Sequence, residues 1–128
     1  MTSGTRYFTP REAEQTLPLV RRIVEDILEA GRVIRERSLA VGSGAENDPE
    51  IVRSIERLEE LFGELEELGC SYRDWNFTVG LVDFPARIDG EEVSLCWKSD
   101  EARIGFYHGE EDGFAGRKPI PPDLLGSR

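Results

Sequence analysis

The side chains best suited to chemistry lie in the last third of the chain, around its only histidine. His108 is followed by Glu110, Glu111 and Asp112, and Glu101 precedes it. An imidazole among carboxylates can hold a divalent metal ion, or can transfer protons while a carboxylate orients it. These residues do not follow the spacing of a recognised catalytic motif. The sequence therefore favours a protein without enzymatic activity.

A metal ion held by His108 with Glu110 and Glu101 is one interpretation of this cluster. In the other interpretation the acids lie in a solvated loop, and hydrogen bonds satisfy the two nitrogens of His108 at the edge of a sheet. The second interpretation needs no cofactor, and we favour it. A divalent metal ion remains the alternative cofactor.

Residues 113–118 read GFAGRK, two glycines followed by two cations. Glycine permits unusual backbone angles, and paired cations in an acidic protein could form a loop that binds phosphate or carboxylate. The alternative is a tight loop in which Phe114 fills the core and Arg117 pairs with a surface acid. We favour the tight structural loop, because no strand-to-helix phosphate motif accompanies the glycines. The candidate ligand-binding residues, for which a small anion is the expected ligand, are Trp97, Glu101, His108 and Arg117.

Composition narrows the class of protein. The 128 residues suit one domain with its own core, and 26 acidic against 16 basic residues give a formal net charge of -10 at pH 7. Such a charge repels nucleic acid and anionic membrane surfaces, so neither is an expected partner. No leading apolar segment and no run of about 20 apolar residues is present. We expect a cytoplasmic protein in which Cys70 and Cys96 are free thiols.

Two long helices are expected, over residues 9–40 and 49–68. Thr9 and Glu12 form a capping box, and Asp48 precedes Pro49 as a second cap. Pro18 predicts either a kink in the first helix, which we favour, or a second helix that begins after Thr16. Apolar residues step by three and four along both helices, which predicts an antiparallel helical hairpin with coiled-coil seams. The predicted seam residues are Leu17, Val20, Val24, Ile27, Gly31 and Ile34 in the first helix and Ile51, Ile55, Leu58, Phe62 and Leu65 in the second.

Beyond Cys70 the apolar period changes to two, which predicts strands. A two-residue turn at Asp89-Gly90 fixes the register of the first hairpin, with Val82 opposite Trp97 and Asp83 opposite Cys96. The negative charge of Asp83 would raise the pKa of the Cys96 thiol, so a packed, unreactive thiol is expected.

The second turn is predicted at residues 99–102. A loop of this length sets Ile104 beside Trp97 and Phe106 beside Leu95, with Gly105 opposite Cys96, and His108 then faces Val93 on the apolar side of the sheet. The pairing predicts that Cys96 and His108 lie on opposite faces of the sheet. A joint metal site of cysteine and histidine is therefore not expected.

Several blocks of sequence resemble the small bacterial family known as domain of unknown function 2203. The resemblance covers nearly the whole chain, and it departs from the family pattern at Ser99-Asp100, in the second turn. It implies no activity and assigns no role to any residue. The blocks are Tyr7-Phe8-Thr9-Pro10, Glu12-Ala13, Leu17-Pro18, residues 80–85, Leu95-Cys96-Trp97, Glu101, His108 and residues 113–117.

The expected fold is α+β. One domain, residues 1–128, has a long kinked antiparallel helical hairpin packed on a three-stranded antiparallel β-meander over residues 77–108, and residues 109–128 form a loop and extended tail. The expected function is a non-enzymatic interaction or small-ligand-binding module that self-associates, as a dimer. The alternative is a small metal-dependent enzyme or metal sensor that uses His108 and nearby carboxylates.

Overall fold

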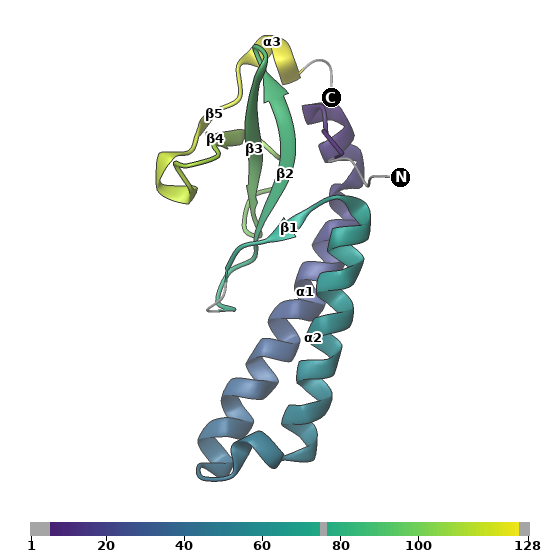
Figure 1. Cartoon of the computed structure of the whole chain (residues 1–128), viewed down its shortest axis with the longest axis vertical. Coiled ribbons are helices and arrows are strands. Elements are labelled where there is room, and N and C mark those ends of the chain that lie inside the picture. Colours follow the sequence, from purple (N-terminus) through teal and green to yellow (C-terminus); the bar gives the residue numbers. More distant parts are fainter. Residues whose placement is uncertain (1–5, 75–76, 126–128) are drawn as a thin grey trace.

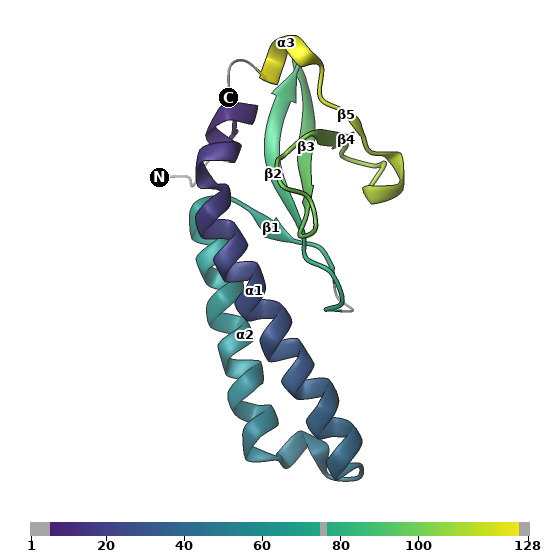
Figure 2. The same ribbon diagram turned by 180° about the vertical axis from the view of Figure 1, so that it is seen from behind.

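The computed structural model describes residues 6–74 and 77–125. It has the expected α+β architecture, in which a helical hairpin of α1 (Pro10–Val41) and α2 (Pro49–Leu68) packs beside an antiparallel sheet (Figure 1). The ends of the two helices that lie near the turn between them extend beyond the sheet (Figure 2). One face of the sheet is turned toward the helices, and the opposite face is called the outer face below.

The helix starts are those that the sequence predicts. Thr9 and Glu12 complete the capping box of α1, and Asp48 accepts a hydrogen bond from the backbone N–H of Ile51 at the start of α2. α1 runs through Pro18 as one helix, so a separate helix beginning after Thr16 does not form. The short 3-10 helix η1 (Ala45–Asn47) lies in the turn between α1 and α2.

The sheet has five strands where three were predicted. β2 (Leu81–Ile88), β3 (Glu91–Lys98) and β4 (Phe106–Gly109) form the predicted meander, and the two-residue strands β1 (Ser71–Tyr72) and β5 (Lys118–Pro119) add one edge each, in the order β1-β2-β3-β4-β5. Strands this short carry too few residues for an alternating pattern, which is why the sequence did not predict them.

The segment expected to be a loop and extended tail contains short helices and a strand among its described residues. It contains the 3-10 helix η2 (Phe114–Gly116), β5 and the short helix α3 (Pro122–Leu125). Ile120 is buried in the core, and its N–H donates to the carbonyl oxygen of Gly105. The tail therefore contributes to the domain core.

The predicted seam of α1 is buried from Leu17 to Gly31, and Ile23 joins it. In α2 the prediction is wrong at Ile55, which is 44% exposed, and Leu61 is buried instead. The buried residues of α2, at positions 51, 58, 61 and 65, step by seven, three and four along one face of the helix, and Ile55 lies at the margin of that face. No helix of the described residues is long and apolar enough to cross a bilayer.

The first hairpin has the predicted register, with Val82 opposite Trp97 and Asp83 opposite Cys96. Positive φ angles at Asp89 (54°) and Gly90 (82°) match the two central positions of a type I′ turn.

The predicted register of the second hairpin is wrong by one residue. Phe106 lies opposite Cys96, and His108 lies opposite Ser94 rather than Val93. Because successive side chains point to opposite faces of a strand, this shift moves His108 to the outer face and Tyr107 to the face that packs on the core.

The connection between β3 and β4 explains the shift. It wraps around the Glu101 side chain, whose Oε1 accepts hydrogen bonds from the backbone N–H of Lys98 at 2.9 Å and from Arg117 at 2.8 Å. The Trp97 indole N–H also donates to the Glu101 carbonyl oxygen, at 2.9 Å. These contacts hold a longer connection than the four-residue turn predicted from the sequence.

Candidate functional site

The corrected register brings three side chains with metal-binding atoms together on the outer face. Asp83 comes from β2, Cys96 from β3 and His108 from β4. One ligand atom from each residue lies within 4.8 Å of the other two. All three residues are buried, with exposed fractions of 7%, 1% and 5% respectively. The separation of Cys96 from His108 expected from the sequence is therefore wrong.

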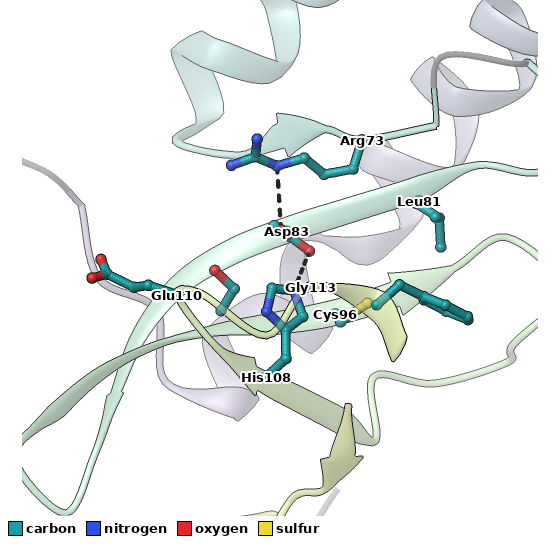
Figure 3. A pocket seen from close by; sticks show the side chains of 9 residues that line it. Arg73, Leu81, Asp83, Cys96, His108, Glu110 and Gly113 are labelled. Atoms are coloured by element: carbon teal, nitrogen blue, oxygen red, sulfur yellow. Dashed lines mark hydrogen bonds and ion pairs between the residues drawn. The ribbon is translucent and has the colours of Figure 1, made fainter. Parts of the chain in front are cut away.

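The three residues lie at the floor of a cavity of about 450 Å³ on the outer face (Figure 3). A volume of this size is within the range of small-molecule sites. The strands supply the floor, and the segment after β4 supplies the wall that includes Phe114. The lining residues are Arg73, Leu81, Asp83, Ser94, Cys96, His108, Glu110, Gly113 and Phe114.

The hydrogen bonds of His108 orient its ring toward Asp83. Nδ1 lies 2.8 Å from the carbonyl oxygen of Gly109, and since a carbonyl oxygen only accepts, Nδ1 carries a proton and donates it. Nε2 lies 3.2 Å from Oδ1 of Asp83. The carbonyl holds the proton of Nδ1, and a metal ion bound at Nε2 would take the place of the proton between Nε2 and Asp83.

Asp83 joins the histidine to an arginine. Its Oδ2 lies 3.3 Å from Nε of Arg73, which follows β1, while its Oδ1 contacts His108. Figure 3 shows Arg73 and His108 on opposite sides of the carboxylate. The two oxygens are thus held in different directions, and the arginine would keep Asp83 oriented if Oδ1 were to bind a metal ion.

Burial keeps the Cys96 thiol protonated. Burial, followed by the negative charge of Asp83 and a hydrogen bond to that carboxylate, raises the thiol pKa to about 12. Cys70, which lies outside the cavity, has its pKa raised to about 12 by burial as well. A thiol of this kind is a poor nucleophile, but a metal ion can displace its proton and bind the thiolate.

The distances suit a tetrahedral ion. Zinc bonds of about 2.1 Å to nitrogen and oxygen and about 2.3 Å to sulfur place ligand atoms roughly 3.4 to 3.6 Å apart. The 3.2 Å between His108 Nε2 and Asp83 Oδ1 is close to that value. All three atoms lie within 4.8 Å of one another, so each distance to the Cys96 sulfur exceeds this spacing by no more than about 1.2 Å.

The other candidate residues from the sequence lie elsewhere. Trp97 is fully buried on the face that packs against α1, beneath the guanidinium of Arg21. Glu101 and Arg117 pair with each other, and neither lines the cavity. Of the two carboxylates named with His108 for a metal site, Glu110 lines the cavity, but its carboxylate points away from the contact between Asp83 and His108 (Figure 3).

Arg117 anchors the segment that covers one side of the cavity. Its guanidinium lies 4.1 Å from the ring centre of Phe106 and 4.8 Å from that of Phe114, and it donates to the Cys96 carbonyl oxygen. Arg117 pairs with an acid as expected, but its partner Glu101 is only 21% exposed and is not the surface acid that was predicted. Phe114 is 43% exposed, so the expectation that it fills the core is wrong.

Sequence reasoning missed Asp83 and Arg73 as site residues. Asp83 was correctly placed opposite Cys96, but the register error put the histidine on the other face. Arg73 carries no sequence signal, since it is one of many cations and follows β1, a strand of only two residues.

The comparisons with known proteins agree with the resemblance noted in the sequence. The sequence of residues 6–120 matches a protein family described as an uncharacterized conserved protein (DUF2203). No curated protein and no solved structure matches the chain. Because the family match spans all five strands and every residue that lines the cavity, the protein belongs to the DUF2203 family.

Proposed function

We propose that this protein binds a transition-metal ion of the zinc class between Asp83, Cys96 and His108. The observation that carries the proposal is the convergence of a carboxylate, a thiol and an imidazole, all buried, at the floor of one cavity. Buried polar groups of three different chemistries rarely meet without a ligand or a hydrogen-bond network that needs them. The site differs from the one suggested by the sequence, which used His108 with Glu101 and Glu110.

The donor set indicates which ions fit. Imidazole nitrogen and thiolate sulfur favour zinc and its neighbours in the first transition row, whereas magnesium and calcium favour sites made of oxygen atoms. One carboxylate oxygen completes a mixed set that Zn²⁺ accepts. Three protein ligands leave a tetrahedral ion with one further position, as in zinc sites that exchange a bound water or substrate.

The test is the metal content of purified protein, followed by titration of the metal-free form with Zn²⁺ and Co²⁺. We expect one tightly bound ion per chain. Asp83→Asn, Cys96→Ser and His108→Gln should each weaken binding by roughly tenfold or more, because each removes one ligand while keeping similar volume. Cys70→Ser is the matched control, since Cys70 is also a buried thiol but lies outside the cavity.

Two results would contradict the proposal. One is a wild-type chain that binds no ion in the titration. The other is a set of folded ligand variants that bind the ion as tightly as the wild type. The circular dichroism spectrum of each variant distinguishes a lost ligand from a lost fold.

Self-association is a second candidate function, and exposed apolar residues on the helical hairpin favour it. Val52 and Ile55 are 40% and 44% exposed and lie three residues apart on α2, so they are neighbours on one side of the helix. We propose that a second copy of the chain covers them. Sedimentation over a concentration series should show a dimer that Ile55→Lys dissociates, while Glu67→Gln, an equal change of charge on the same helix, leaves it intact. A wild-type chain that stays monomeric would exclude this candidate.

A further inference from the structure

The metal site proposed above has its remaining coordination position on the cavity side. Asp83, Cys96 and His108 all line the cavity and are supplied by the strands at its floor. The backbone of β2, β3 and β4 occupies the other side of the three ligands. A fourth ligand must therefore come from the cavity, and the lining residues include no further histidine or cysteine.

The charges at the floor determine what that ligand is. A divalent ion carries +2, and a carboxylate from Asp83 with a thiolate from Cys96 offsets it, while a histidine that binds a metal is neutral. Arg73 is the one cation among the described residues that line the cavity. It adds +1, while the −1 of Glu110 lies on a carboxylate turned away from the floor, so the positive charge beside the metal and Arg73 attracts one negative charge.

Arg73 is placed to bind that charge. Its contact with Asp83 is made through Nε, and its side chain is 57% exposed. Figure 3 shows the two terminal nitrogens of the guanidinium directed away from Asp83. A guanidinium with two free terminal nitrogens binds a carboxylate through paired hydrogen bonds.

The rest of the cavity is suited to an apolar group. Leu81 and Phe114 form part of its wall. Phe114 is 43% exposed, so part of its ring is accessible to a ligand in the cavity. Glu110 also lines the cavity with its carboxylate turned outward, where it would repel a second negative charge on a ligand (Figure 3). A small molecule with one anionic end and an apolar body fits these walls.

We infer that the cavity binds a small monocarboxylate with an apolar body, whose carboxylate binds both the metal ion and the guanidinium of Arg73. The inference rests on the proposed metal site. The metal supplies most of the attraction, so the metal-free protein should bind the same compounds much more weakly.

The test uses protein loaded with Co²⁺, whose visible absorption reports changes at the metal. Benzoate should change the spectrum in a saturable manner, and benzamide, which has the same shape without the charge, should not. Arg73→Gln, measured at a Co²⁺ concentration that saturates its metal site, should lose roughly tenfold or more in affinity for benzoate. Arg87→Gln, which removes a cation from β2 outside the cavity, should bind benzoate as the wild type does.

The outcomes separate the two proposals. If the chain holds no metal, the proposed function fails and the inference fails with it. If Co²⁺ binds but benzoate leaves its spectrum unchanged, or binds equally to Arg73→Gln, the inference is wrong and the metal site stands. If inorganic phosphate binds and benzoate does not, the assignment to monocarboxylates is overturned.

Discussion

The imidazole of His108 lies 3.2 Å from the carboxylate of Asp83, although 25 positions separate the two residues in the sequence. The contact spans the sheet, since Asp83 is on β2 and His108 on β4, with Cys96 of β3 between these strands. The antiparallel meander is therefore what assembles the site. Any change that shifts the pairing of β3 with β4 by one residue would remove the histidine from it.

Binding of zinc should stabilise the fold. An ion that binds the folded chain alone contributes about 2.7 kcal/mol to the free energy of unfolding when its concentration is 100 times its Kd. Urea unfolding of the wild type with and without Zn²⁺ measures this difference. Under the same conditions Zn²⁺ should raise the free energy of unfolding of His108→Gln much less, and that of Cys70→Ser as much as that of the wild type. An equal gain in His108→Gln would show that Zn²⁺ acts at another place.

Metal binding should release a proton from Cys96. Burial raises the pKa of this thiol to about 12, so at neutral pH it is protonated and must lose its proton when the sulfur binds the ion. At pH values below that pKa, the thiolate fraction rises about tenfold for each pH unit. Between pH 7.5 and 9 the apparent metal affinity should therefore also rise about tenfold for each pH unit. Titration in weakly buffered solution measures the released proton. Affinity that is independent of pH would mean that the sulfur is not a ligand.

The first hairpin shows what the sequence determines well. Asp89 and Gly90 fix a two-residue turn, and a turn of known length sets the face of every residue in β2 and β3. The helix starts were equally predictable, because caps such as Thr9 and Asp48 satisfy backbone groups within a few residues. Local chemistry was sufficient in each of these cases.

The second hairpin shows where local chemistry is insufficient. The length of its connection depends on Glu101, and the carboxylate of Glu101 is held by Arg117, which follows β4. A contact between distant residues thus sets the register, and the register decides whether His108 faces the core or the cavity. The apolar pattern favours the four-residue connection, because that turn places both Ile104 and Phe106 on the core face, whereas in the observed register Phe106 faces outward and Tyr107 packs on the core. The candidate site was missed because it depends on that one choice.

Asp48 should be important for the stability of the helical hairpin. Its carboxylate caps α2 and pairs with Arg37 of α1, at 2.6 Å. The hydrogen bond with Arg37 lowers its pKa, so the pair stabilises the folded chain above the ordinary pKa of an aspartate and loses this effect as the pH falls through the lowered value. Asp48→Ala should lower the Tm by a few degrees at pH 7, and Asp48→Asn, which can still cap the helix, by less. Equal losses in both variants would assign the whole effect to the ion pair.

Two helical glycines should respond to alanine in opposite directions. A Cβ atom at Gly31 would lie 2.6 Å from Cβ of Phe77, which packs against α1 at this point, whereas a Cβ atom at Gly63 on α2 meets nothing within 4 Å. Gly31→Ala should therefore lower the free energy of unfolding by about 1 to 3 kcal/mol, because either the helix or the segment that carries Phe77 must move. Gly63→Ala should raise the free energy of unfolding by roughly 0.5 to 1 kcal/mol, through helix propensity alone. Chemical denaturation of both variants measures the difference. A stabilising Gly31→Ala would show that Phe77 does not pack against α1 in solution.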